Sequence, residues 1–401
     1  MTKGINLENV KVSNRASVLK MLSKRGAMSR KDLAAEIGLT AATMTLICSE
    51  LLEEGILIEL GEADQETKRA GRKKILVDIN KDYKKVLCIS IELEDTYISL
   101  SNLGGEIIDE QDIATDSWVA PEEFVSGLAS ICKDLMWAHN VAQDEILAVG
   151  VTIPGRVDRE AGVATNAYGI WDKPVQVGQL LEQELGFPVV VENNVRAYAE
   201  SELVHGAGRE LDNFLLLKWG PGVGAGIIID GQVYQGVSGS AAEIGHMIAV
   251  KNGRQCSCGK RGCLETLISN HAFRQDATEA MSQGKMTVLK QWLDDHKVEI
   301  DDLRTREWAV VDDPELAEML DYKIHLLAVN ACNLVCVLNP TRLVIYGGMF
   351  DIPGFRDKFL SAYREFDPNV ADDFIEESQL ADRVYCYGPL AIVMNEMIFN
   401  V

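Results

Sequence analysis

Four potential metal ligands lie close together near the middle of the sequence, in the segment EIGHMIAVKNGRQCSCGKRGCLE (243–265). They are one imidazole and three thiols: His246, Cys256, Cys258 and Cys263. Cysteines clustered in this way in a reducing compartment more often bind a metal than form disulfides. Three thiols and one imidazole complete the tetrahedral coordination of zinc and leave no position for an activated water. The spacing therefore predicts a structural zinc site that fixes a glycine-rich loop, with a set of reduced surface cysteines as the alternative.

A glycine run at 220–226, GPGVGAG, is a second pattern with possible chemistry. A dinucleotide-binding fingerprint needs a strand before such a run and a helix directly after it. Here the run leads into IIIDGQVY, whose Asp230-Gly231 pair indicates a two-residue β-hairpin turn. We therefore expect no dinucleotide site, although the backbone N–H groups of a glycine turn can still approach a phosphate.

Basic and hydroxyl side chains gather near the N-terminus, where residues 1–31 carry eight Lys and Arg residues against one acidic residue. Apolar spacing predicts three helices there, at 14–24, 31–38 and 41–55. Ser29 and Thr40 are suited to N-cap the second and third helices, and Gly38 is suited to the turn between them. The following segment, 56–79, has the pattern of two strands around a polar, basic loop. Three helices followed by such a wing are typical of a winged helix-turn-helix domain.

In such a domain the third helix enters the major groove of DNA by its N-terminal end. That end carries the hydroxyls of Thr40, Thr43 and Thr45. Arg30 and Lys31 would face phosphates. The wing would add four basic side chains: Arg69, Arg72, Lys73 and Lys74. The alternative is a small helical module for protein contacts, whose basic residues are merely solvated.

The net charge of the whole chain argues against DNA binding, but the distribution of that charge does not. The 401 residues include 39 Lys+Arg and 61 Asp+Glu, a net charge of −22. Residues 1–80 hold 13 basic and 11 acidic residues, so the acidic excess belongs to residues 81–401. No run approaches the roughly 20 apolar residues of a membrane span, and the N-terminus lacks the apolar core of a secretory signal. We therefore expect a cytoplasmic protein with no membrane partner.

Residues 81–401 alternate strand-like and helix-like segments, which favours an α/β fold. Patterns of strands and turns predict hairpins at 85–108 and 214–236, and a strand at 146–157. An amphipathic pattern predicts a helix at 122–139, and 187–206 has the pattern of a strand that runs into a helix. The remaining cysteines are interpreted as small core residues: Cys48, Cys88, Cys132, Cys332, Cys336 and Cys386.

The body resembles the ROK family of repressors and sugar kinases over essentially all of residues 81–401. The matching segments are IPGRV (153–157), VENNVRA (191–197), KWGPGVGAGIIIDGQVYQGVSGSAAEIGHM (218–247), CSCGKRGCLE (256–265) and VIYGGMF (344–350). The resemblance implies an α/β, actin/hexokinase-like fold of two ribonuclease-H-like lobes that close on a sugar. It also implies that zinc is held by His246, Cys256, Cys258 and Cys263.

A fused winged helix-turn-helix marks the repressor branch of this family, as in its xylose-, glucose- and N-acetylglucosamine-responsive regulators. We therefore expect a DNA-binding head at 1–80 and a first ribonuclease-H-like lobe at 81–200, rejoined by a C-terminal helix at 388–401. A second lobe at 201–387 would carry the zinc loop and sugar-binding residues.

Three departures from the kinase pattern of the family argue against catalysis. The kinases receive ATP phosphates on a DxGGT loop, whereas the corresponding stretch here, 90–94, reads SIELE and carries two carboxylates. Two like charges about 4 Å apart repel by roughly 4 kcal/mol at an effective dielectric constant near 20. The Asn-Asp pair that contains the general base of the kinases is Asn193-Asn194 here, and an amide cannot take a proton from a sugar hydroxyl at neutral pH. Pro221 also replaces a Thr of the second phosphate loop, so we expect no enzyme activity.

The sugar site itself is expected to survive. The resemblance places five residues in it: Asn193, Asn194, Glu243, His246 and Glu265. His246 would serve twice, with one ring nitrogen on zinc and the other toward the sugar. For Glu243 and Glu265 the alternative is loop capping or surface exposure. Trp171 either offers an apolar face to the sugar ring or is an ordinary core tryptophan.

The sequence thus predicts a sugar-responsive transcriptional regulator, most simply a repressor, with structural zinc as its cofactor. Its partners would be operator DNA and a monosaccharide or sugar-derivative effector. The resemblance also implies a homodimer or a dimer of dimers. Two alternatives stay open, an ATP-dependent sugar kinase with a regulatory DNA-binding head and a DNA-bound architectural factor whose body binds no ligand.

Overall fold

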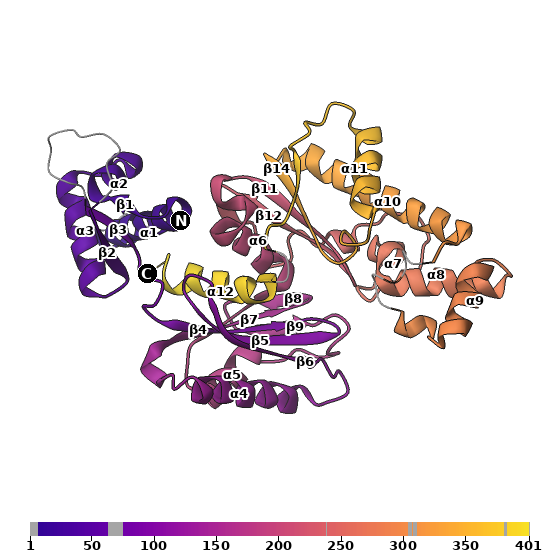
Figure 1. The fold of residues 1–401 in the computed structure, drawn as a ribbon, viewed down its shortest axis with the longest axis horizontal. Coiled ribbons are helices and arrows are strands. Elements are labelled where there is room, and N and C mark those ends of the chain that lie inside the picture. Colours follow the sequence, from indigo (N-terminus) through magenta and orange to yellow (C-terminus); the bar gives the residue numbers. More distant parts are fainter. Residues whose placement is uncertain are drawn as a thin grey trace. The chain divides into compact units, whose positions relative to one another are not determined.

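The computed structural model describes residues 7–62, 75–237, 239–303, 307, 311–380 and 383–400. It consists of two compact units. The first unit combines Met1–His205 with Asp382–Val401, and the second unit is Gly206–Ala381. Each unit contains a five-stranded sheet with helices packed against it (Figure 1).

The N-terminal part of the first unit has three helices and a small antiparallel sheet (Figure 1). The helices are α1 (Leu7–Arg25), α2 (Arg30–Ile37) and α3 (Ala41–Glu53). The sheet has the order β1-β3-β2 and consists of β1 (Met28–Ser29), β2 (Leu57–Glu62) and β3 (Ile75–Ile79). The predicted order of three helices followed by two strands is confirmed. The loop between β2 and β3 lies outside the described residues, and with it lie the predicted DNA contacts Arg69, Arg72 and Lys73.

The turns of this part form as the sequence predicted. The Ser29 hydroxyl accepts a hydrogen bond from the Asp32 backbone N–H at 3.2 Å, and the Thr40 hydroxyl accepts one from the Thr43 backbone N–H at 3.2 Å, so both residues are N-caps. Gly38 ends α2 at a φ of 76°, which glycine adopts without strain. Helix α1 begins earlier than the predicted 14–24, because residues 9–13 are exposed and leave no apolar stripe in the sequence.

A five-stranded mixed sheet forms the core of the rest of the first unit. Its order is β10-β7-β4-β5-β6, in which β4, β5 and β6 form an antiparallel meander that β7 and β10 extend in parallel. The strands are β4 (Lys85–Ile91), β5 (Asp95–Asn102), β6 (Ile107–Ala114), β7 (Ile146–Ile153) and β10 (Val189–Asn193). The predicted hairpin at 85–108 is confirmed. The strand predicted at 146–157 forms as β7 but ends at Ile153, before the Pro-Gly turn at 154–155, and Arg156 begins the separate strand of a short hairpin.

Helices cover both faces of this sheet because alternate strand residues on both faces are apolar. Leu87 and Ile89 share a core with α4 (Pro121–Ala138) and α5 (Val177–Leu185), whereas Val86 and Cys88 share one with α12 (Val384–Met397). Helix α6 (Asn194–His205) follows β10 directly and packs against α12. Between β7 and α5 lies a short hairpin of β8 (Arg156–Asp158) and β9 (Val163–Asn166).

The second unit repeats the sheet topology of the first. Its order is β13-β12-β11-β14-β15, again an antiparallel meander extended by two parallel strands. The strands are β11 (Phe214–Trp219), β12 (Val223–Ile229), β13 (Gln232–Val233), β14 (Arg342–Tyr346) and β15 (Ile375–Glu377). The helices are α7 (Glu265–Ile268), α8 (Asn270–Ser282), α9 (Thr287–His296), α10 (Pro314–Leu338) and α11 (Phe355–Phe366). Short 3-10 turns in the two units are η1 (Gln143–Glu145), η2 (Ala207–Glu210), η3 (Ile244–His246) and η4 (Ile300–Asp302).

The glycine run that follows β11 is a turn between two strands. Gly220 and Gly222 close it with a backbone hydrogen bond of 2.9 Å, and β12 runs antiparallel to β11. Asp230 and Gly231 then have φ values of 51° and 69°, as a two-residue turn with two left-handed positions requires. The dinucleotide reading is therefore excluded by the local structure, as the sequence context indicated.

Helix α10 is long and apolar. In the described part of the chain it is the single helix whose length and hydropathy would suit a membrane span, with the bent pair α2 and α3 as a second candidate if counted as one span. Leu320, Ile324 and Leu327 of α10 lie in the core of the second unit, which is the other common setting for such a helix. Its C-terminal part corrects one prediction, because Cys336 is exposed and is not a core thiol.

Candidate functional site

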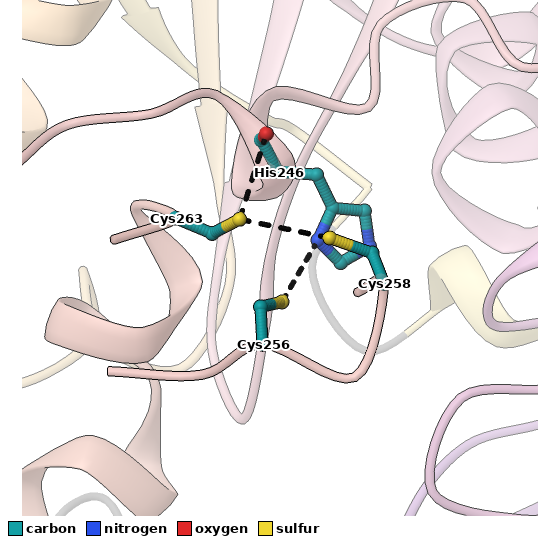
Figure 2. A group of neighbouring side chains, drawn as sticks. All are labelled: His246, Cys256, Cys258 and Cys263. Carbon is teal, nitrogen blue, oxygen red and sulfur yellow. Dashed lines mark hydrogen bonds between the residues drawn. The ribbon is translucent and has the colours of Figure 1, made fainter. Parts of the chain in front are cut away.

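The predicted metal ligands converge in the second unit. The imidazole and the three sulfur atoms turn toward one another (Figure 2), and the ligand atoms of His246, Cys256, Cys258 and Cys263 all lie within 4.8 Å of one another. The Cys258 and Cys263 sulfurs are 3.6 Å apart, and Cys256 Sγ lies 3.4 Å from His246 Nδ1. Sulfur ligands of a tetrahedral zinc ion lie about 3.8 Å apart, because each Zn–S bond is about 2.3 Å long. The donor set therefore fits such an ion.

Close backbone packing holds this loop in shape. Gly262 has a φ of 76°, and a Cβ atom there would lie 1.9 Å from the Val250 carbonyl oxygen, so only glycine fits. Cys263 follows directly and pairs with Ile248 in an isolated β-bridge, while the Lys260 ammonium group donates to the His246 carbonyl at 3.1 Å. Gly262 thus allows the segment after His246 and the segment that carries Cys263 to pack closely side by side.

The thiols of the cluster differ in acidity. Burial, together with the neighbouring Cys258 and Cys256 thiols, raises the pKa of Cys263 to about 12. Burial also acts on Cys258, but hydrogen bonds from the Lys260 backbone N–H and from the two other thiols outweigh it and hold the pKa of Cys258 below its usual value. Thiols lose their protons when they bind a divalent cation, so metal binding to this cluster would release protons.

His246 is oriented by both of its ring nitrogens. Nδ1 faces the thiols, whereas Nε2 lies 3.9 Å from a carboxylate oxygen of Glu243. His246 is 4 % exposed, so the ring has little room to turn. Nδ1 is therefore the metal-facing nitrogen and Nε2 faces Glu243, an assignment that the sequence left open.

Glu265 lies between the glycine turn and the EIGH segment. Its Oε2 would be 3.2 Å from a Cβ atom placed on either Gly222 or Gly245, so both glycines make room for the carboxylate. Burial raises the pKa of Glu265, and the Val223 backbone N–H, which donates to it, opposes that shift. Glu265 is therefore not a surface residue. It holds one backbone group of the turn, as the capping alternative supposed.

The two asparagines lie in the first unit, at the start of α6. The Asn193 side chain donates to the Gly155 carbonyl at 2.8 Å and accepts from the Arg196 backbone N–H at 3.1 Å, which caps the helix. The Asn194 side chain donates to Glu92 Oε1 at 2.8 Å and accepts from the Val195 backbone N–H at 2.9 Å. Both amides are buried and have a fixed orientation.

Polar contacts inside the first unit hold residues 90–94. This stretch corresponds to the phosphate-binding loop of the kinases in the family that the body resembles. Ser90 is fully buried and bonds to Thr152 at 2.9 Å and to the Tyr198 hydroxyl at 3.2 Å. Glu92 Oε1 accepts hydrogen bonds from Asn194 and from the Tyr198 hydroxyl. A carboxylate and an amide, 102 residues apart in sequence, are thus joined at this point.

The profile of the ROK family matches residues 86–393 of this chain. The chain belongs to the ROK family. It is 27% identical to the xylose repressor of Caldicellulosiruptor bescii over 396 residues, 97% of each chain. It is 30% identical to the glucokinase of Halalkalibacterium halodurans over 267 residues, 65% of this chain and 80% of that one.

A solved structure extends this likeness to the fold of the whole chain. The crystal structure of a ROK family transcriptional regulator, described as a homologue of the Escherichia coli MLC protein, has a TM-score of 0.79 at 24% identity. It covers 98% of this chain and 97% of its own. The expected α/β, actin/hexokinase-like fold is therefore confirmed.

Trp171 of the ROK body is a core residue. It is 5 % exposed and meets Phe124 of α4 edge to face, with ring centroids 6.1 Å apart. The ordinary core reading of this tryptophan is thus favoured over contact with a sugar ring. Its indole N–H has no hydrogen-bond partner among the residues that the structure describes.

Sequence reasoning missed a buried group of charges beside Asn193. Arg159 lies 3.2 Å from Glu192 and 3.0 Å from Glu200, and Arg196 lies 2.6 Å from Glu192. Glu192 also accepts from the Asn193 backbone N–H at 2.6 Å. The available signal was the spacing of Glu192 and Arg196, four residues apart, but charges at that spacing usually mark an exposed helix face.

A second missed group supports the metal loop. Asp276 of α8 pairs with Arg254 of the loop and with Lys323 of α10. Both cations also donate to carbonyls of the short helix α7, Arg254 to Thr266 and Lys323 to Leu267. Lys323 is 2 % exposed, and burial lowers its pKa although Asp276 opposes the shift.

The predicted DNA contacts that the structure describes already have intramolecular partners. Arg30 pairs with Glu59 of β2 at 2.7 Å. The Thr40 and Thr43 hydroxyls bond to each other at 2.9 Å, and the Thr45 hydroxyl donates to the Ala41 carbonyl at 2.8 Å. Thr40 and Thr45 are nevertheless exposed, so their side chains can be reached from outside.

Proposed function

We propose that this ROK-family chain is a sugar-responsive, DNA-binding transcriptional regulator that acts as a repressor. The observation that carries the proposal is the geometry of its N-terminal helices. The chain bends by 118° between α2 and α3, within the range of about 90–120° that is typical of helix-turn-helix domains. The xylose repressor of Caldicellulosiruptor bescii aligns over 97% of the chain, head included, which supports the same conclusion.

We assign DNA binding to a winged helix-turn-helix at 1–80, with α3 as the recognition helix. Its exposed N-terminal end would offer Thr40, Thr43 and Thr45 to base edges, and Arg30 to a phosphate once it leaves Glu59. Arg69, Arg72 and Lys73 of the wing complete the proposed contacts. The partner is a near-palindromic operator, bound by a homodimer or a dimer of dimers in the cytoplasm.

The effector is a monosaccharide or sugar derivative, and its proposed ligands are Asn193, Asn194, Glu243, His246 and Glu265. Amides and carboxylates suit a sugar because each hydroxyl both donates and accepts hydrogen bonds. The metal bound by His246 and the three cysteines would be structural zinc, because four protein ligands leave no open position. The metal would hold the His246 ring in place, and the position of the Glu243 carboxylate beside that ring would then depend on the metal.

An ATP-dependent sugar kinase is the second candidate, favoured by the 30% identity to a glucokinase. Against it stands Asn194, whose amide is bonded to Glu92 and cannot act as a general base. We therefore expect no sugar-dependent conversion of ATP to ADP, with the phosphoryl group transferred to the sugar, by the purified chain. Turnover above a no-sugar control, in a coupled assay with xylose, glucose and N-acetylglucosamine, would restore the kinase reading.

The regulator is tested by operator gel shifts titrated with a panel of monosaccharides and their phosphates. One member of the panel should change operator affinity at least about tenfold, the effect of a coupling free energy near 1.4 kcal/mol. Glu243→Ala should abolish that response while leaving operator binding in the absence of sugar intact. An unchanged response in the variant would refute the assignment of Glu243, and a protein that binds no DNA would refute the function.

A further inference from the structure

We propose that Glu92 makes the effector site selective for a neutral sugar hydroxyl and against a sugar phosphate. The inference rests on the proposed function, because it takes Asn194 as a sugar ligand. It predicts that the group of the effector that faces Asn194 is an uncharged hydroxyl and not a phosphate. Its basis is the contact between Glu92 and Asn194 and the way in which the surrounding residues fix both side chains.

The carboxylate of Glu92 is directed at α6 by the turn that carries it. The Glu92 backbone N–H bonds to the Asp95 carbonyl at 3.0 Å, which closes the turn between β4 and β5. Asn194 and Tyr198 lie four residues apart on one face of α6, and both donate to Glu92 Oε1. One carboxylate oxygen therefore receives two hydrogen bonds from the first two turns of the helix.

Tyr198, the second donor, is itself fixed. It is 1 % exposed, its hydroxyl lies 3.2 Å from Ser90, and its ring meets Tyr385 of α12 edge to face with centroids 6.3 Å apart. Ser90 in turn accepts from Thr152 at 2.9 Å. Because these side chains come from β4, β7, α6 and α12, the carboxylate cannot swing away without disturbing a packed interior.

The hydrogen-bond inventory at this place suits a hydroxyl better than a phosphate. A phosphate oxygen accepts hydrogen bonds and is therefore recognised by N–H and O–H donors. The single proton of Tyr198 already goes to Glu92, and so does one N–H of Asn194. A carboxylate oxygen such as those of Glu92 only accepts hydrogen bonds, so a sugar hydroxyl can donate to it whereas the oxygens of a phosphate ester cannot.

The charge of the turn acts in the same direction. Glu92 is followed by Glu94 and Asp95, so three carboxylates lie within four residues. Burial raises the pKa of Tyr97 on β5, and Asp95 and Glu92 raise it further, as negative charge near a phenol does. A phosphate ester at this end of the site would meet the same negative field.

The experiment is isothermal titration calorimetry of the full chain with matched pairs, glucose against glucose 6-phosphate and N-acetylglucosamine against its 6-phosphate, with xylose as a further neutral sugar. The neutral sugar should bind at least about tenfold more tightly than its phosphate. Glu92→Gln, which keeps an acceptor for Asn194 and Tyr198 but removes the charge, should strengthen phosphate binding about tenfold relative to neutral-sugar binding. Glu94→Gln, in the same turn, should shift the ratio less than about threefold.

Each outcome decides something different. A wild-type preference for the phosphate, or an unchanged ratio in Glu92→Gln, would overturn the role of Glu92 and leave the regulator standing. Equal shifts in the two variants would assign the effect to the charge of the turn as a whole and would also overturn it. Absence of binding by every sugar would overturn the proposed function, and this inference with it. If Glu92→Gln does not fold, a wild-type preference for the phosphate over the neutral sugar would still overturn the proposal.

Discussion

His246 offers its two ring nitrogens to different partners, Nδ1 to the Cys256 thiol and Nε2 to the Glu243 carboxylate. A metal on Nδ1 would fix the orientation of the ring and therefore the position of Nε2, which faces Glu243. One side chain therefore connects a structural site to a proposed effector ligand. A substitution that removes a thiol of the cluster should consequently weaken the sugar response as well as metal binding.

Cys258 is the best probe of that connection because it is the one thiol of the cluster that is partly exposed. We expect Cys258→Ser to lose most bound zinc and to weaken the sugar response about tenfold or more, since even the loss of a group that only orients a metal ligand commonly reduces metal affinity 10- to 100-fold. Elemental analysis after gel filtration measures the metal. Cys336→Ser, which removes an exposed thiol of α10, is the control and should retain the full metal content.

Glu200 gives a prediction on pH. Burial raises its pKa, although the Arg159 guanidinium 3.0 Å away opposes the shift. A carboxyl with a raised folded-state pKa binds protons more readily in the folded state than in the unfolded state. Its contribution to stability therefore grows as pH falls through the folded pKa and is complete below the unfolded value of about 4.3.

We expect the free energy of unfolding of the wild type, relative to Glu200→Gln, to rise as pH falls from about 7.5 to about 5. Urea unfolding at the two pH values measures the difference. A relative stability of the wild type that falls with pH would mean that Arg159 dominates and that the pKa of Glu200 is depressed.

At the scale of elements, the sequence predicted what depends on neighbours in the chain. Ser29, Gly38 and Thr40 set helix ends through contacts three or four residues away, and Asp230-Gly231 sets a turn by itself. The thiol cluster was predictable because all its ligands lie in one loop. The bond between Glu92 and Asn194 was not, because nothing local in either segment shows that β4 and the start of α6 meet.

The charged group that holds α7, formed by Arg254, Asp276 and Lys323, could not be predicted from the sequence for the same reason; we call it the α7 clamp. Arg254, Asp276 and Lys323 come from a loop and two helices, and each of them taken alone has the pattern of a solvated charge. In the structure, Asp276 joins the two cations, and both cations bind carbonyls at the end of α7. Because α7 begins at Glu265 and follows Cys263, this clamp positions a proposed sugar ligand and a metal ligand together.

We expect Lys323→Met to destabilise the chain by about 2 kcal/mol, because Asp276 loses its buried cation and keeps only the partly exposed Arg254. The double variant Lys323→Met/Asp276→Leu should recover much of that loss, since neither charge then remains buried. Urea unfolding followed by circular dichroism measures both. Lys358→Met breaks an exposed pair with Asp321 and should change stability by less than about 1 kcal/mol.

Arg30 offers a test at the DNA-binding end. Its ion pair with Glu59 must be given up before the guanidinium can bind a phosphate. Glu59→Gln should therefore strengthen operator binding, and Arg30→Ala should weaken it and reduce the salt dependence by about one phosphate contact. Fluorescence anisotropy with labelled operator at several salt concentrations measures both. A weaker complex with Glu59→Gln would show that the ion pair orients α2 for binding.

For the whole molecule, the uneven charge has a consequence for specificity. Residues 1–80 carry a net charge of +2 (13 basic and 11 acidic residues) and residues 81–401 one of −24 (26 and 50), so DNA is attracted by the head and repelled by the body. Such a chain should have weak non-specific binding to DNA, because the charge that holds phosphates is confined to a small area. Selectivity for an operator would then depend more on the proposed contacts of α3 than on bulk electrostatics.

Effector binding should also be visible as a change in the stability of the whole chain. A sugar that binds only the folded state adds about 2.7 kcal/mol at a concentration one hundred times its Kd. We expect the unfolding temperature to rise with the logarithm of the concentration of the correct sugar. Glu243→Ala should unfold at a temperature that the same sugar does not change.

Helix α12 completes the first unit, although the ribosome makes it only after the whole second unit. At about 5–20 residues per second, the roughly 180 residues in between take about 10–35 s to synthesise. During that time Val86, Cys88 and Ala148 lack the helix that covers their face of the sheet. A chain whose translation stops early should therefore be recognised by chaperones or proteases as unfinished. We expect that few truncated chains survive to occupy operators without sensing sugar.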